Sequence, residues 1–80
     1  MILLEKVVNG NKTGYHYTPE KKGTPGFISF NSETQQVEIV DLSEYDKELG
    51  HSYYAHKALG AVYRMVTSGK LEEKRLLAWF

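Results

Sequence analysis

The sequence contains no cysteine among its 80 residues. This absence excludes disulfide bonds, thiolate metal ligands and thiol nucleophiles together. It also favours a reducing compartment, because small secreted domains are commonly rich in disulfides. No stretch approaches the roughly 20 apolar residues of a membrane-spanning helix. The opening residues, Met1 to Lys6, become charged too early for a signal peptide. We therefore expect a cytoplasmic protein that does not enter a membrane.

Neither sign of charge is in excess, since 10 basic and 10 acidic residues give a formal net charge of zero. Affinity for nucleic acid comes largely from an excess of Lys and Arg, so nucleic acid is not the expected main partner. The charges are nevertheless segregated. The first half is locally basic around Lys12, Lys21 and Lys22, whereas residues 33–48 are rich in acids. This asymmetry could steer a charged partner, although two solvated loops of opposite sign are the simpler interpretation.

Motifs for catalysis and metal binding are also missing. There is no Gly-x-Ser-x-Gly elbow and no glycine-spaced phosphate loop. His51 and His56 are five residues apart, about 140° around a helix, and His16 belongs to a different element. A zinc site normally needs three or four ligands held together. We therefore predict a non-enzymatic protein with no metal site and no cofactor.

The pattern of apolar residues predicts a single α+β domain over residues 1–80. Strands are expected at residues 2–8, 15–18, 27–30, 36–42 and 75–80, and the main helix at 52–67. The resulting order is β-β-β-β-α-β, a mostly antiparallel five-stranded sheet with one main helix packed on one face. In the fourth strand, alternation places Val37, Ile39 and Asp41 on one face and Glu38, Val40 and Leu42 on the other.

The helix has clear end signals. Ser68-Gly69 is a typical stop, and Ser43 could cap an earlier start at Glu44. One stripe of this helix carries small and aliphatic residues and should face the sheet. These residues are Ala55, Leu59, Val62 and Val66.

The chain ends in Leu77-Ala78-Trp79-Phe80, which is unusually apolar for a terminus. We expect this segment to be docked as the last strand, with Leu77 and Trp79 turned inward and Leu76 and Phe80 on the uncovered face. Deletion of the last two residues should cost several kcal/mol, because loss of a buried aromatic side chain costs about 3–5 kcal/mol.

The outer face of the helix carries the candidate partner-binding residues. Gly60 lies there, although glycine inside a helix costs about 1 kcal/mol relative to alanine. A close-packed neighbour would offset this cost, and Tyr and Arg are enriched in interface hot spots. The candidates are Tyr53, His56, Gly60, Tyr63 and Arg64. They favour a small protein-interaction module that associates with a protein partner or with itself as a homodimer. A surface helix that tolerates the glycine is the competing interpretation of the same residues.

A second hypothesis uses the strands. Aromatic residues lie near Lys12, Lys21 and Lys22, and an aromatic sheet face can stack the bases of single-stranded nucleic acid. The residues concerned are Tyr15, Tyr17, Phe27 and Phe30. Alternation into the core is the competing interpretation of the same four residues.

Three short segments resemble a group of short uncharacterised proteins from Gram-positive bacteria. They are Ala55-His56-Lys57-Ala58-Leu59, Leu77-Ala78-Trp79-Phe80 and the Pro25-Gly26 pair before the third strand. The resemblance implies a bacterial, cytoplasmic setting. It implies no activity and no functional residues.

Overall fold

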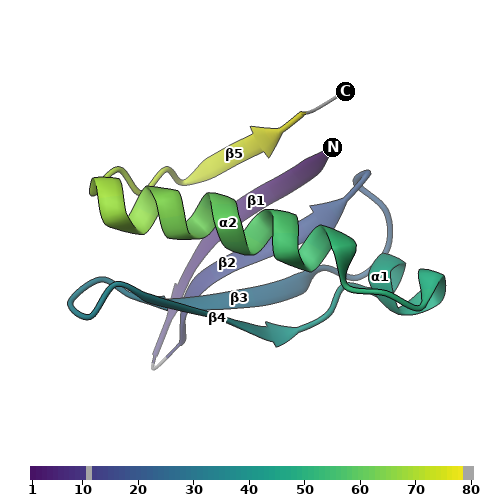
Figure 1. Ribbon diagram of the computed structural model, residues 1–80, viewed down its shortest axis with the longest axis horizontal. Coiled ribbons are helices and arrows are strands. Elements are labelled where there is room, and N and C mark those ends of the chain that lie inside the picture. The colour runs from purple at the N-terminus through teal and green to yellow at the C-terminus, as the bar shows by residue number, and fades with distance from the viewer. Residues whose placement is uncertain (11, 79–80) are drawn as a thin grey trace.

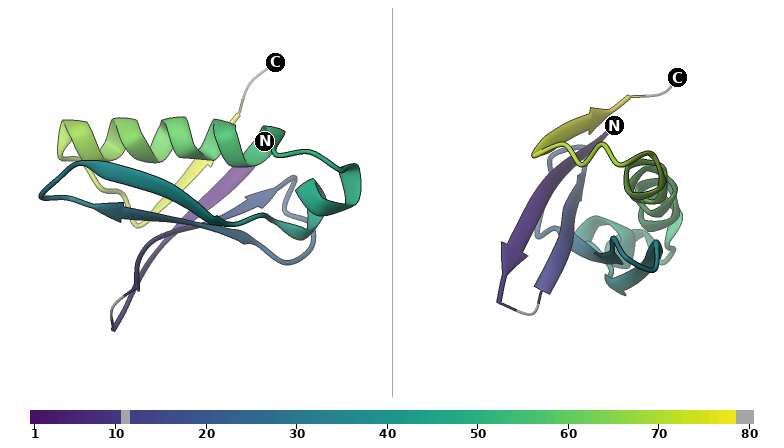
Figure 2. Two further views of the ribbon diagram at one scale, coloured as in Figure 1. Left: turned by 60° about the horizontal axis from the view of Figure 1, so that its bottom comes forward. Right: turned by 90° about the vertical axis from the view of Figure 1, so that its left-hand side faces the viewer.

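The computed structural model describes residues 1–10 and 12–78. Its elements in chain order are β1 (Ile2–Asn9), β2 (Lys12–Pro19), β3 (Gly26–Asn31), β4 (Gln36–Asp41), α1 (Glu44–Leu49), α2 (Tyr53–Ser68) and β5 (Lys74–Leu77). The five strands form one antiparallel sheet in the order β4-β3-β2-β1-β5. Helix α2 lies across one face of this sheet (Figures 1 and 2). The predicted fold class and element order are therefore confirmed, with α1 as an additional short helix.

The core lies between α2 and the sheet face beneath it. The cross-strand pairs Leu4–Tyr17 and Tyr15–Ile28 place their side chains on that face, since neighbours in register point to the same side. Helix α2 buries Ala55, Ala58, Ala61, Val62, Met65 and Val66. Three of these are alanines, and the small side chains let the helix backbone approach the sheet closely.

The two helix-end signals predicted from the sequence, the Ser68-Gly69 stop and the Ser43 cap, are both present. Gly69 adopts a left-handed conformation with φ +75° and donates its backbone N–H to the carbonyls of Met65 and Val66, a common glycine stop. The side chain of Ser43 accepts a hydrogen bond from the backbone N–H of Asp46 and caps α1. Gly50, also left-handed, ends α1 after six residues, so the chain forms two helices rather than one.

The predicted faces of the fourth strand are only partly right. The pairing of β3 with β4 shifts between Phe27 and Ile28, where Phe27 pairs with Asp41 and Ile28 with Ile39. This irregularity accommodates Val40 as an extra residue, in the manner of a β-bulge. Beyond it the alternation is reversed, so that Leu42 packs against the core and Asp41 is exposed.

At the other edge of the sheet, β5 pairs with β1 over four residues. Leu77 packs against the core and Leu76 is 49% exposed, so the predicted orientation of this strand is confirmed for both. The predictions for Trp79 and Phe80 concern positions outside the described residues.

Candidate interaction surface

A buried carboxylate fixes the position of α2. Asp46 is fully buried, and its Oδ1 and Oδ2 accept hydrogen bonds from the backbone N–H groups of Tyr54 (3.2 Å) and Ala55 (3.0 Å). A carboxylate at the start of a helix accepts hydrogen bonds from backbone N–H groups that have no partner within the helix, and its negative charge is stabilised by the positive end of the helix dipole. Ser52, the residue directly before α2, makes no side-chain cap. Asp46 from α1 therefore supplies the N-terminal cap of α2.

Tyr17 links this cap to the sheet. Its hydroxyl donates to Asp46 Oδ2 at 3.0 Å and accepts the backbone N–H of Ser43 at 2.8 Å. Burial, partly offset by the hydrogen bond from Ser43, raises the pKa of Tyr17 to about 12. The network is complete, because no described buried side-chain N or O atom lacks a hydrogen-bond partner. Tyr17 therefore has a structural role inside the domain.

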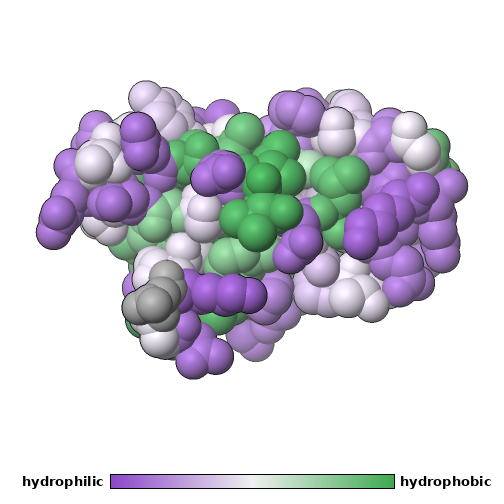
Figure 3. All heavy atoms as spheres, turned by 90° about the horizontal axis from the view of Figure 1, so that it is seen from below, coloured by the Kyte–Doolittle hydropathy of each residue, from purple (hydrophilic) through white to green (hydrophobic). Residues whose placement is uncertain are grey.

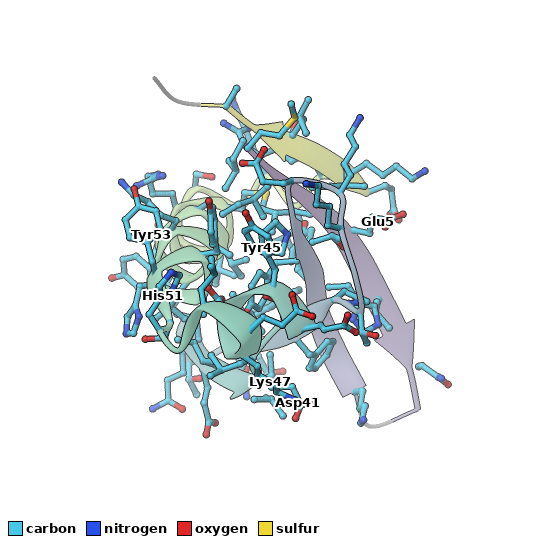
Figure 4. The ribbon with its side chains drawn as sticks, turned by 90° about the vertical axis from the view of Figure 1, so that its right-hand side faces the viewer. Glu5, Asp41, Tyr45, Lys47, His51 and Tyr53 are labelled. Carbon is cyan, nitrogen blue, oxygen red and sulfur yellow. The ribbon has the colours of Figure 1, made fainter. Side chains whose placement is uncertain are left out.

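Four rings gather over the corner between α1 and α2. Tyr54 lies at the centre, with ring-centroid distances of 5.5 Å to Tyr45, 5.3 Å to Tyr53 and 6.2 Å to His51. Nδ1 of His51 lies 3.2 Å from the backbone nitrogen of Tyr53 and 3.3 Å from Asp46 Oδ1. Figure 4 shows Tyr45, His51 and Tyr53 on the helical side of the molecule, away from Glu5 on β1. The corner therefore holds the first turn of α2, including Tyr53, in place.

The five residues predicted on the outer face of α2 all lie on its outward side. We call this set, Tyr53, His56, Gly60, Tyr63 and Arg64, the outward stripe. Tyr53 is 48% exposed and Tyr63 is 50% exposed, which are large fractions for aromatic residues. Lys57 lies beside the stripe, with its Nζ 5.6 Å from the centre of the Tyr53 ring. The stripe therefore combines two exposed phenol rings with basic groups.

Gly60 occupies the middle of the outward stripe. A Cβ atom built there would meet only Nη1 of Arg64 within 4 Å, at an ordinary contact distance of 3.8 Å. Gly26 is different, because a Cβ there would lie 2.6 Å from the carbonyl oxygen of Asp41 and overlap the Tyr17 ring. Packing within the described chain therefore requires glycine at position 26 and does not require it at position 60.

Charge on α2 is of one sign. The helix carries Lys57 and Arg64 and contains no acidic residue. Arg64 forms no ion pair with any residue in the described ranges. A surface of this kind complements an acidic partner.

A second exposed surface follows the edge strand β4. Val37 and Ile39 are half-buried against the core and Val40 is 49% exposed. Hydrophobic side chains gather in the middle of the face on which β4 lies (Figure 3). Tyr63 of α2 lines a shallow groove together with Val37 and Glu38, so the outward stripe and the β4 edge meet at Tyr63.

The predicted aromatic sheet face does not exist as an exposed surface. Tyr15, Tyr17, Phe27 and Phe30 are only 0–7% exposed. Three of the rings belong to the core beneath α2. Phe27 lies on the opposite sheet face under Lys12 and against His16, at 5.9 Å and 5.3 Å from its ring centre. Strand alternation buries these rings, and they present no stacking surface in the described chain.

The three histidines lie in different surroundings. His16 contacts Phe27 on the sheet, His51 contacts Asp46 at the helix corner, and Nδ1 of His56 lies 2.9 Å from the carbonyl oxygen of Ser52. Residues 1–10 and 12–78 contain no group of three or more His, Asp or Glu side chains that could hold a metal ion.

Sequence reasoning missed two features of this surface, the edge position of β4 and the ring cluster at the helix corner. A run of consecutive hairpins predicts that its last strand lies at an edge, and this signal was available for β4. The ring cluster has no comparable signal, because it depends on how Gly50 turns the chain between the two helices.

Comparison with known proteins found no matching protein family, no matching curated protein and no matching solved structure. In the described part of the chain, no helix has the length and apolar character needed to cross a bilayer.

Proposed function

We propose that this protein is a small non-catalytic interaction module of the bacterial cytoplasm, and that the outward stripe of α2 binds a protein partner. The observation that carries the proposal is Gly60. It costs α2 about 1 kcal/mol relative to alanine, and the space that its missing side chain leaves is bordered in the described chain only by Nη1 of Arg64, 3.8 Å from a Cβ built there. A partner backbone packed against the helix at this point would use that space.

The residues around Gly60 suit an interface. Tyr53 and Tyr63 flank it along the helix, and both are about half exposed. Tyrosine and arginine are the residues that most often dominate binding energy, and they do so at the centre of an interface. Tyr53 is also held by the rings of His51 and Tyr54, so little side-chain freedom would be lost on binding.

Charge selects the kind of partner for the stripe. Pairing α2 with α2 of a second copy would gather two lysines and two arginines with no carboxylate on either helix. Like charges facing each other oppose association. The stripe therefore suits a different protein that carries acidic residues, and self-association belongs to another surface.

Site-specific photo-cross-linking in the producing cell tests the proposal. A benzophenone amino acid is placed at His56 or Tyr63 on the stripe, and at Lys47 or Val8 as exposed controls elsewhere. We expect discrete cross-linked protein products from the two stripe positions only. Equal products from all four positions, or none from the stripe, would contradict the proposal.

A further inference from the structure

We propose that an extended, acidic segment of the protein partner binds at the groove between α2 and β5 and joins the sheet as a sixth strand beside β5. This inference rests on the partner-binding role proposed above and names the chemistry of the partner. The groove borders the outward stripe at Arg64, so one partner can reach both surfaces.

The groove exists because α2 does not cover the whole sheet. The helix packs mainly on β3 and β4, and β5 lies at the far edge beyond β1 (Figure 1). Two adjoining hollows of about 340 and 330 Å³ lie between α2 and β5, and Arg64 and Arg75 line both. Arg75 pairs with Leu4, a core residue, so its side chain is on the helix side of the sheet. The helix therefore forms one wall of the groove and β5 forms its floor.

The groove is basic. Its lining includes the cations Lys57, Arg64, Lys70 and Arg75, and Glu72 is the one acid among the described lining residues. Glu72 is already paired, since its Oε2 lies 2.7 Å from Nη1 of Arg75. Neither Arg64 nor Lys70 forms an ion pair with a residue in the described ranges. The chain as a whole is neutral, so this excess is local to the groove, and it complements carboxylates.

The backbone of β5 has an unpaired side. The strand is the last in the sheet order, and only β1 pairs with it. The N–H of Lys6 donates to the carbonyl of Glu73, and the direction of such bonds alternates along an antiparallel strand. Lys74 and Leu76 therefore turn their N–H and C=O groups away from β1. No backbone hydrogen bond from elsewhere in the described chain reaches them, and such an open edge is a template for one more strand.

The side chains of β5 specify the order of residues in the added strand. The strand begins with two cations, Lys74 and Arg75, and ends with two aliphatic residues, Leu76 and Leu77. Side chains directly opposite each other on paired strands interact. An antiparallel neighbour therefore needs two aliphatic residues followed by two acids. One of these acids lies on the helix side of the sheet, opposite Arg75 and beside the groove that Arg64 lines.

These observations favour a peptide over nucleic acid. A nucleic acid would also neutralise the cations of the groove. Its backbone cannot pair with the outward groups of Lys74 and Leu76 as a strand does, and it would leave the side chain of Leu76, which is 49% exposed, without an apolar partner.

An NMR titration of the isotopically labelled protein tests the inference. The probe is the peptide Thr-Thr-Val-Ile-Glu-Glu-Thr-Thr, which matches β5 as an antiparallel neighbour. The control is the same peptide with glutamine in place of both acids. The acidic peptide should shift the amide signals of residues 74–77 and of Arg64 most, and its affinity should fall as salt is added. The glutamine peptide should bind about fivefold more weakly or less.

Proline at position 76 separates strand pairing from attraction by charge alone. Leu76→Pro removes an N–H that points away from β1, so the bonds between β1 and β5 remain, as proline allows on an edge strand. Leu76→Ala is the matched control, because it also loses the leucine side chain but keeps the N–H. Leu76→Pro should bind the acidic peptide about fivefold more weakly than Leu76→Ala. Circular dichroism confirms that each variant is folded.

A second substitution tests the charge of the groove and leaves the outward stripe unchanged. Arg75→Gln should weaken binding of the acidic peptide about fivefold. Lys47→Gln, which removes an exposed cation from α1, should leave the affinity unchanged.

The outcomes distinguish this inference from the proposed function. Peptide-induced shifts away from β5, equal binding by Leu76→Pro and Leu76→Ala, or equal effects of Arg75→Gln and Lys47→Gln would overturn the inference. Tighter binding of a single-stranded oligonucleotide of the same charge would also overturn it. None of these results changes the cross-links expected from His56 and Tyr63, and the absence of those cross-links overturns the proposed function instead.

Discussion

The phenol of Tyr17 on β2 donates a hydrogen bond to the buried carboxylate of Asp46 on α1 at 3.0 Å. Asp46 in turn accepts the backbone N–H groups of Tyr54 and Ala55 at the start of α2. Tyr17 and Asp46 together therefore connect the sheet to α1 and α2. The orientation of α2, and with it the outward stripe, depends on this link.

Asp46→Asn should destabilise the fold by about 2–4 kcal/mol, because an amide cannot accept all of these hydrogen bonds and would turn an N–H group toward another donor. Urea denaturation measures the change. Asp41→Asn is the matched control, since Asp41 is exposed on the adjoining strand, and it should change stability by less than about 0.5 kcal/mol. Equal effects at the two positions would show that the buried cap is unimportant.

Tyr17 should make the fold sensitive to alkali. Its pKa is about 12 in the folded state and about 10 in an unfolded chain. The unfolded state therefore loses its proton first, so the stabilising contribution is complete below about pH 10 and is lost as pH rises toward about 12. Urea denaturation repeated from pH 8 to pH 12 should show this loss as one part of the total decrease in the free energy of unfolding. Tyr17→Phe should be less stable at pH 8 by about 1–3 kcal/mol, and its free energy of unfolding should fall less steeply with pH. Identical slopes for the two proteins would contradict the role given to Tyr17.

The turn after β2 stores strain that one substitution should release. Glu20 and Lys21 have φ values of +53° and +56°, and the N–H of Lys22 bonds the carbonyl of Pro19 at 3.0 Å. This is the geometry of a type I′ turn, which favours glycine and asparagine. Lys21→Gly should stabilise the protein by about 1 kcal/mol, as removal of a left-handed strain exceeds the entropy cost of glycine. Lys22→Gly, at a position without positive φ, should give no gain in melting temperature.

Gly26 should tolerate no side chain. A Cβ atom there would overlap the ring of Tyr17 and lie 2.6 Å from the carbonyl oxygen of Asp41, and overpacking of this kind costs about 1–3 kcal/mol or more. Gly26→Ala should therefore lower the melting temperature clearly. A neutral result would mean that the spacing between β2, β3 and β4 is looser than described.

The sequence predicted the parts of this fold that depend on local signals. Strand alternation, the Ser68-Gly69 stop and the Ser43 cap were each encoded within a few residues, and each is present. The reversal of faces at Leu42 was not predictable in this way, because the bulge at Val40 arises from the register between two strands.

The candidate site was also predictable only where local sequence signals determine it. The outward stripe followed from helical periodicity alone, and all five of its residues are on the outer side of α2. The second hypothesis, an exposed aromatic sheet face, is wrong because all four rings are buried, and alternation within one strand does not say which face the helix will cover. Asp46 looked like one more acid in an acidic segment, since its burial depends on hydrogen bonds to residues eight and nine positions further along the chain.

The central claim is that the outward stripe binds a partner at Gly60, and Gly60→Ala tests it most directly. The added methyl group would make only an ordinary contact with Nη1 of Arg64 in the described chain, so the variant should be more stable by about 1 kcal/mol. The yield of the product cross-linked from position 63 should nevertheless fall, and fall further in Gly60→Leu. Higher stability with an undiminished yield of that product in both variants would contradict the account.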